Sequence, residues 1–106
     1  MSPKLKRSVR LLSIAEQDLQ ELLLYVAAEN STAALVLADK IEAELAKLGT
    51  YPYLGKIPQD THLAQLEYRV LVVGDYLLFY KIKGRTILIY RILHGARDVP
   101  RLLEDA

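Results

Sequence analysis

The sequence predicts an α+β domain in which a helical hairpin packs on an antiparallel sheet, in the order β-α-α-β-β-β. Three observations predict it: a short apolar segment near the start, two amphipathic helical patterns after it, and a final third with apolar residues at a period of two. We find no internal repeat or linker in the 106 residues. One domain spanning residues 1–106 is therefore expected, with residues 1–7 as a flexible basic arm.

Composition narrows the class of protein. An apolar content of 52% with 25% charged residues is typical of a globular chain, and no run reaches the ~20 apolar residues that span a bilayer. There is no cysteine, and the two histidines, His62 and His94, are too few for an all-histidine site. We therefore expect no disulfide, metal or cofactor, no membrane partner, and a cytoplasmic location.

Charge is divided along the chain. Residues 1–13 carry only basic charges, whereas residues 14–48 carry seven acids against Lys40 and Lys47. Two interpretations stand: a solvated acidic helical face, or a molecule with one acidic and one basic side.

The first half predicts a strand and two helices. Residues 9–13 form the apolar strand, and Ser13 and Glu16 have the spacing of a capping box that begins a helix. Asn30-Ser31-Thr32 offers caps for the second helix, and Gly49 is placed to end it. The apolar stripes that should pack on a core are Leu19, Leu22, Leu23 and Val26 in the first helix, and Ala34, Ala38, Ile41, Leu45 and Leu48 in the second.

Residues 49–65 predict a loop without regular structure, because two prolines and Gly55 interrupt it. Two interpretations apply to Tyr51 and Tyr53: they plug the end of the core, or the long loop has a functional role.

From residue 66 the pattern predicts three strands joined by two-residue turns at Gly74-Asp75 and Gly84-Arg85, which fix the register. One face would carry Arg69, Leu71, Val73, Leu78, Tyr80, Ile82, Ile87, Ile89 and Arg91. The other would carry Tyr68, Val70, Val72, Leu77, Phe79, Lys81, Leu88, Tyr90, Ile92 and His94. Helices can cover only one apolar face, so the loop, the C-terminal segment or a partner must cover the other. Residues 99–105 predict a short terminal helix with Asp98 as its N-cap.

The chemistry that remains gathers at the end of the last strand. A nucleophile elbow and glycine-rich phosphate loops are absent from the sequence. His94, Arg91 and Arg97 could move a proton and hold a phosphate, as RNA cleavage without metal requires. The alternative is structural, with His94 hydrogen-bonded at the strand end and both arginines paired with Glu67 or Asp98.

The motifs Pro52-Tyr-Leu-Gly55, Tyr68-Arg69, Gly74-Asp75-Tyr76 and Arg91-Ile-Leu-His94-Gly-Ala-Arg97-Asp98 occur in this order. With this order of elements, the chain resembles the RelE/ParE superfamily of type II toxin–antitoxin modules, also called plasmid stabilisation proteins. The resemblance implies a toxin neutralised by a cognate antitoxin that covers apolar surface. Within the superfamily, RelE-like members cut messenger RNA on the ribosome and ParE-like members poison DNA gyrase.

At the positions where the nuclease branch carries basic side chains, this sequence has Tyr68, Val70 and Leu77. The arginine that the nuclease branch carries just past the last strand does have a counterpart here, Arg97. The resemblance therefore favours a ParE-like gyrase inhibitor that acts by binding and is not an enzyme. A metal-independent, RelE-like endoribonuclease acting on ribosome and mRNA, and an inactive member of the fold, are the alternatives. The expected partner-binding residues are Tyr68, Val70, Val72, Leu77, Phe79 and Tyr90. A homodimer and a toxin–antitoxin heterotetramer both stay open.

Overall fold

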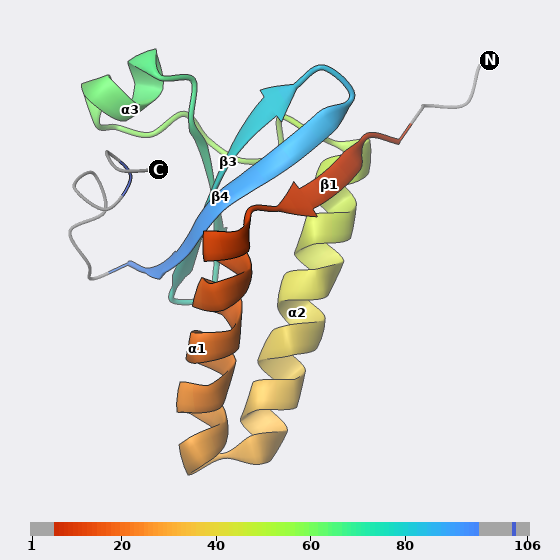
Figure 1. Cartoon of the computed structure of the whole chain (residues 1–106), viewed down its shortest axis with the longest axis vertical. Coiled ribbons are helices and arrows are strands. Elements are labelled where there is room, and N and C mark those ends of the chain that lie inside the picture. The colour runs from red at the N-terminus through yellow and green to blue at the C-terminus, as the bar shows by residue number, and fades with distance from the viewer. Residues whose placement is uncertain (1–5, 96–102, 104–106) are drawn as a thin grey trace.

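Two long helices cover one face of a four-stranded sheet in the computed structural model, which describes residues 6–95 and residue 103 (Figure 1). The elements are β1 (Ser8–Leu11), α1 (Ser13–Glu29), α2 (Ser31–Thr50), α3 (Thr61–Gln65), β2 (Arg69–Val73), β3 (Tyr76–Lys83) and β4 (Thr86–His94). The strand order is β1-β4-β3-β2, with β1 parallel to β4 and the other pairs antiparallel. The predicted fold class and order of elements are confirmed.

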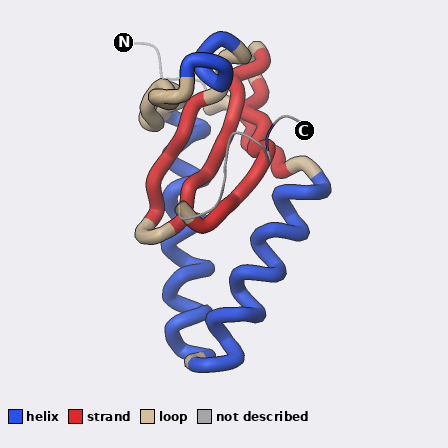
Figure 2. The backbone as a smooth tube through the Cα atoms, turned by 90° about the vertical axis from the view of Figure 1, so that its left-hand side faces the viewer, coloured by secondary structure: helices blue, strands red, loops and turns tan. Residues whose placement is uncertain are grey.

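The helical hairpin is tight, because Asn30 alone separates α1 from α2. Its side-chain Oδ1 accepts a hydrogen bond from the Ala33 amide at 3.0 Å, as an N-cap does. The joined ends of the two helices project beyond the strands (Figure 2). Much of the hairpin tip therefore has no sheet to pack against.

The capping box predicted at Ser13 is wrong. The N-cap of α1 is Leu12, which makes no side-chain cap. Its amide donates to the Ile89 carbonyl at 3.0 Å, so the chain passes directly from the sheet into the helix and Ser13 is already helical.

Gly49 also has a different role from the one predicted, because α2 continues through it to Thr50. A Cβ atom at Gly49 would lie 2.9 Å from the Arg7 carbonyl oxygen, and the Arg7 amide donates to the Gly49 carbonyl at 2.8 Å. Glycine is thus required for the close approach of two backbones. Arg7 is fixed at this contact, and residues 1–5 of the predicted arm lie outside the described residues.

The segment predicted as an irregular loop contains the short helix α3, which is a correction. The Asp60 carboxylate caps it by accepting from the Leu63 amide at 2.9 Å. Leu63 is 2% exposed, so this single turn supplies one apolar side chain to the core.

The two predicted turns are confirmed. Val73 pairs with Tyr76 and Lys83 with Thr86, leaving two residues in each turn. Gly74 and Gly84 both have φ +59°, and a positive φ at the first central residue alone is the type II′ pattern.

The predicted register fails beyond Ile89 because a β-bulge shifts the β3–β4 pairing between Phe79 and Tyr80. Tyr80 still pairs with Ile89, but Phe79 pairs with Arg91, so Tyr90 is the extra residue. The shift turns Ile92 toward the helices beside Leu78, instead of away from them.

The same shift moves two other side chains. Leu93 is buried on the opposite face, and His94 pairs with Tyr76 on the face toward α1. The predicted positions of Arg91, Ile92 and His94 are therefore corrected.

The core has two parts, one on each face of the sheet. The inner core lies under α1 and α2, and its buried members are Ala15, Ile41, Leu48, Leu71, Val73, Leu78, Tyr80, Ile87, Ile89 and Ile92. The outer core is smaller and consists of Leu63, Tyr68, Phe79, Leu93 and Leu103. Leu103 is helical, whereas the rest of the predicted terminal helix, with its cap at Asp98, lies outside the described residues.

Candidate functional site

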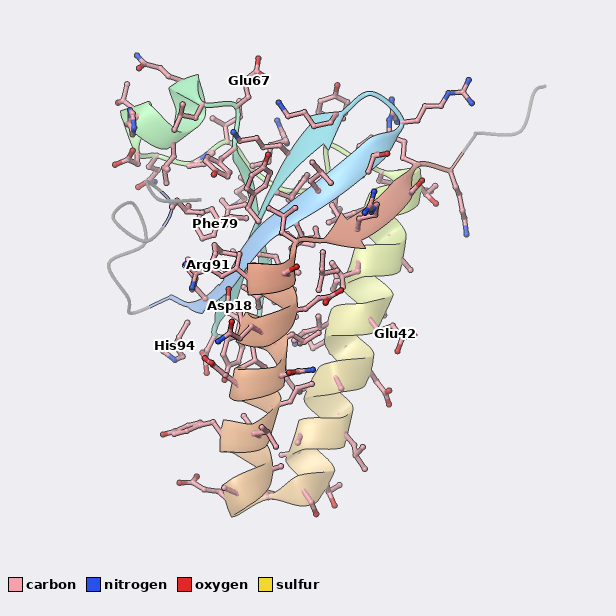
Figure 3. All side chains as sticks on the ribbon, viewed as in Figure 1. Asp18, Glu42, Glu67, Phe79, Arg91 and His94 are labelled. Atoms are coloured by element: carbon pink, nitrogen blue, oxygen red, sulfur yellow. The ribbon has the colours of Figure 1, made fainter. Side chains whose placement is uncertain are left out.

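The Arg91 guanidinium is bound to Asp18 on α1 (Figure 3). Its Nε lies 2.7 Å from Asp18 Oδ2 and its second terminal nitrogen 2.9 Å from Oδ1, a bidentate pair. The Asp18 carboxylate also accepts from the Ile92 amide at 3.0 Å. This hydrogen bonding raises the pKa of Arg91 above its ordinary value, against the effect of burial.

Sequence reasoning missed Asp18 as this partner, because Asp18 is 73 residues away in the chain and had been assigned to an exposed acidic helix face. The structure thus adds Asp18 as a partner of Arg91 that the sequence did not indicate, and Asp98, one of the two predicted partners, lies outside the described residues. Asp18 ties α1 to the β4 bulge, which is a structural role.

His94 is exposed, and its ring meets the Tyr76 ring edge-on with centroids 5.6 Å apart. It borders a hollow of about 440 Å³ that is also lined by Asp18, Glu21 and Tyr25. Arg97, the third residue of the expected cluster, lies outside the described residues.

The six expected partner-binding residues do lie on the outer face but differ in exposure. Tyr68 and Phe79 are each 3% exposed, because Leu63 and Leu103 pack over them. Val70, Leu77 and Tyr90 are half-buried around them, and Val72 is 59% exposed. Part of the predicted surface is thus already covered by the chain itself.

Lys81 is the cation at the centre of this face. Its ammonium lies 4.3 Å from the centroid of the Tyr68 ring and 5.0 Å from that of Tyr90, within cation–π range. The two rings meet edge-on at 5.2 Å. Burial lowers the pKa of Lys81, with Lys83 adding to the effect and Glu67 opposing it, and burial raises the pKa of Tyr68.

The helical hairpin carries a second apolar surface, on the side away from the sheet. A groove of about 590 Å³ runs between α1 and α2, and it is lined by Gln20, Leu23, Leu24, Ala27, Ser31, Ala34, Leu35 and Ala38. Leu24 is 71% and Leu35 69% exposed. Leu23, Ala34 and Ala38, which were predicted to pack on a core, line this groove, and of these three Ala34 is buried as predicted.

Within residues 6–95 and residue 103, no three acidic or histidine side chains gather as a metal site would require. In the same part of the chain, no helix is both long enough and apolar enough to cross a membrane.

The family model for the ParE toxin of type II toxin–antitoxin systems, parDE, matches residues 9–99. The chain belongs to the ParE toxin family. It is thus a type II toxin of the RelE/ParE superfamily, as the sequence motifs predicted.

Two solved structures share the fold. One is the chromosomal ParDE toxin–antitoxin system from P. aeruginosa, with 20% identity, a TM-score of 0.69, and coverage of 84% of this chain and 96% of that chain. The other is the toxin–antitoxin complex RelBE2 from Mycobacterium tuberculosis, with 24% identity, a TM-score of 0.60, and coverage of 92% and 100%. No curated protein matches the sequence significantly.

Proposed function

We propose that this ParE-family toxin acts by binding and poisoning DNA gyrase and is neutralised by a cognate antitoxin. One observation carries the proposal: the outer face, where a nuclease would hold a converging set of charged groups, is apolar at Tyr68, Val70 and Leu77. Tyr68 is buried, and the Arg91 guanidinium is bound to Asp18 on α1. Because removing one preorganised electrostatic group typically costs about 10²- to 10³-fold in rate, a face that lacks several is poorly suited to catalysis.

For the antitoxin we propose two apolar surfaces that residues 6–95 and residue 103 leave at least partly exposed. The half-buried residues Val70, Leu77 and Tyr90 with exposed Val72 form one, and the hairpin groove forms the other. Both structures of similar fold are of toxin–antitoxin systems, which supports such a partner here.

RNA cleavage is the second candidate, and Lys81 is the observation in its favour. Its ammonium lies over two tyrosine rings, and the pKa of Lys81 is lowered by burial. A cation beside aromatic rings could meet a phosphate and a base. Lys81 alone is not enough, however, because a ParE-family toxin that cut RNA would need further groups to handle the proton and the leaving group.

The test is to induce the toxin alone and identify the lesion. Gyrase-trapped DNA breaks with filamented cells are expected, and ribosome-dependent cuts in messenger RNA would instead establish the nuclease. Arg97→Ala and Lys81→Met should both remain toxic, because a binding surface spreads its energy over many contacts. Loss of toxicity in either single variant, with folding retained, would favour catalysis.

A further inference from the structure

The parallel pairing of β1 with β4 brings the basic start of the chain beside the β3–β4 turn. The Arg7 Nε donates to the Gly84 carbonyl at 3.2 Å, and the Ser8 amide donates to the Arg85 carbonyl at 3.0 Å. Figure 1 shows this turn and the start of β1 at the opposite end of the molecule from the hairpin tip. Two groups of cations that are separate in the sequence therefore share one surface.

The strand register adds cations on the outer face of the sheet next to this contact. Arg10 pairs with Leu88 and Leu88 pairs with Lys81, so the three side chains form one row across β1, β4 and β3. With neighbouring strands about 4.8 Å apart, the Cα atoms of Arg10 and Lys81 lie about 10 Å from each other. The next row, two residues along, consists of Ser8, Thr86 and Lys83. The cations of this surface, named the basic rim below, are Arg7, Arg10, Lys81, Lys83 and Arg85.

Carboxylates leave the charge of the basic rim almost uncompensated. Within residues 6–95 and residue 103, no carboxylate lies within ion-pair distance of a rim cation. Burial and Lys83 lower the pKa of Lys81, and Glu67 acts against them as the one acid at the border of the rim. Asp60 caps α3, and Asp75 lies in the β2–β3 turn at the other end of β3. The rim is thus a positive surface.

Two other arginines of the sheet are not part of the rim. The Arg69 guanidinium donates to the Gly55 carbonyl at 2.6 Å and to the Tyr53 carbonyl at 3.3 Å, so it holds the loop after α2. Arg91 is bound to Asp18. Both of these arginines are held by acceptors of the chain itself, unlike the side chains of Arg10, Lys83 and Arg85, which are exposed.

The helical hairpin carries the opposite charge. Residues 13–50 have seven acids against Lys40 and Lys47. The molecule therefore has an acidic end and a basic end, which matches the second interpretation of the charge pattern. A polyanion would be attracted to the rim and repelled by the hairpin, so the charge division also sets its orientation on the toxin.

The side chains of the rim favour a nucleic acid over a protein as its partner. Protein interfaces have an apolar and often aromatic centre, whereas protein–DNA interfaces are polar and strongly positive. Between the rim cations stand the hydroxyl groups of Ser8 and Thr86, which can donate to phosphates, and half-buried Leu88. Large apolar side chains are exposed elsewhere: Tyr51 at 54% and Tyr53 at 67% belong to the loop after α2, so they do not plug the core as one interpretation held.

Duplex DNA fits the rim better than a single strand does. Proteins that bind single strands stack the bases on exposed aromatic rings. The two rings that adjoin the rim are covered, because Tyr68 is 3% exposed, Tyr90 meets it edge-on, and the Lys81 ammonium lies over both. Contact with a phosphate backbone does not need such rings.

We propose that the basic rim binds the phosphate backbone of duplex DNA without reading its sequence. The inference rests on the proposed function only in the source of the DNA, which is the segment that gyrase holds. The rim shares no residue with the two surfaces proposed for the antitoxin and adjoins one of them at Tyr90.

The test measures binding of the purified toxin to a fluorescent DNA duplex of random sequence, by anisotropy at a series of salt concentrations. The wild type should bind with a Kd of about 10⁻⁴–10⁻⁶ M at physiological salt, and more tightly as salt is lowered. Arg10→Ala/Lys83→Ala should bind at least about tenfold more weakly, with a salt slope smaller by about 2, because two phosphate contacts are lost. No binding by the wild type at low salt, or an unchanged slope in the variant, would overturn the inference.

The matched control is Lys40→Ala/Lys47→Ala, which removes the same charge from exposed positions on α2. It should bind DNA as the wild type does, and an equal loss in both double variants would mean that only net charge matters, which overturns the rim. Thermal unfolding of both should match the wild type, because the four side chains are exposed. If Arg10→Ala/Lys83→Ala unfolds at a lower temperature, Lys83→Ala/Arg85→Ala replaces it with the same expected loss.

Two further probes separate duplex DNA from other polyanions. Single-stranded RNA of the same length and polyglutamate should both bind more weakly than the duplex. Tighter binding of the RNA would overturn the assignment to duplex DNA, and so would equal binding of polyglutamate at the same concentration of charge.

The inference and the proposed function can fail separately, because the binding assay contains no gyrase. With gyrase and DNA together, Arg10→Ala/Lys83→Ala should trap fewer breaks than the wild type, while its binding to gyrase without DNA is unchanged. Equal trapping would overturn the gyrase-held segment as the DNA that the rim binds. If the wild type traps no breaks, the proposed function fails and the anisotropy assay still decides whether the rim binds DNA.

Discussion

The two faces of the four-stranded sheet are covered by different means. The inner face lies under two helices, of 17 and 20 residues, and its central residues Leu78 and Ile89 are completely buried. The outer face is covered by Leu63 from a five-residue helix and by Leu103. Among the described residues, the inner face therefore has the larger core and the outer face the smaller one.

The charged side chains of the two faces also differ. The inner side ends in the buried ion pair of Asp18 and Arg91, whereas the outer side holds its cation over two tyrosine rings. Substitutions on the inner side should therefore lower the free energy of unfolding more than comparable substitutions on the outer side.

The largest effect is expected for Asp18→Ala. Removing the carboxylate leaves a buried guanidinium and the Ile92 amide without their acceptor, which should lower the free energy of unfolding by about 3–5 kcal/mol. Urea denaturation would measure it. The control is Glu16→Ala on the exposed side of α1, expected within about 0.5 kcal/mol of wild type. Equal losses in the two variants would contradict the structural role of the pair.

Leu78→Ala and Leu93→Ala compare the two faces directly, since these leucines are 0% and 2% exposed. Both substitutions should lower the free energy of unfolding, by an amount within the range of about 2–5 kcal/mol for such truncations. The loss should be larger for Leu78→Ala than for Leu93→Ala. The reason is that the thin outer cover can collapse into the space left by Leu93, whereas the helices cannot follow Leu78. A larger loss for Leu93 would invert the comparison.

Tyr80→Phe removes the hydroxyl that ties the inner face to the Pro52–Gly55 backbone. We expect a loss of about 1–3 kcal/mol, because the Gly55 amide and the Pro52 carbonyl each lose a buried partner. Hydrogen exchange of the Gly55 amide should also be faster in the Tyr80→Phe variant than in the wild type. Tyr25→Phe serves as the control, and unchanged exchange at Gly55 would mean that the hydroxyl does not hold the loop.

The smallest effect is expected for Lys81→Met and is best seen as a change in pH dependence. Burial lowers the pKa of Lys81, so the folded chain binds fewer protons than the unfolded chain just below the ordinary lysine value of about 10.4, and stability rises with pH through that window. The pKa of Tyr68 is raised, so above about 10 the folded chain retains a proton that the unfolded chain releases, and stability falls.

Lys81→Met should therefore remove the rise in stability with pH and leave the fall in stability at higher pH. Chemical denaturation at a series of alkaline pH values would show this, with Lys40→Met, which changes an exposed lysine on α2, as the control. An identical pH profile in wild type and Lys81→Met would mean that the ring contacts do not perturb the lysine.

Much of the fold could be predicted because its signals are local. The Gly74 and Gly84 turns require positive φ, and Asn30 caps the helix that follows it, so each is visible within a few residues of sequence. The helix α3 was missed because a single turn is too short to show periodicity. The predicted capping box at Ser13 was wrong because the hydrogen bond from the Leu12 amide to the sheet decides where α1 begins.

The candidate site was predicted less well because its contacts are remote in sequence. A register extrapolated from the turn assumes a period of two to the strand end, and no local pattern reports the extra residue Tyr90. Asp18 accepts hydrogen bonds from Arg91 and Ile92, which follow Tyr90 in the chain. The loop was noticed for its length, but the rigidity that Tyr80 and Arg69 give it could be recognised only from the structure.

The bulge at Tyr90 also affects how this toxin is compared with its relatives. A strand of the same length without the bulge would place every later residue on the opposite side. An alignment drawn straight through this point would therefore equate residues of opposite orientation, with Leu93 matched to a helix-facing position and Ile92 to an outward one. Comparisons of activity at the end of β4 thus need a one-residue gap wherever a relative lacks the bulge.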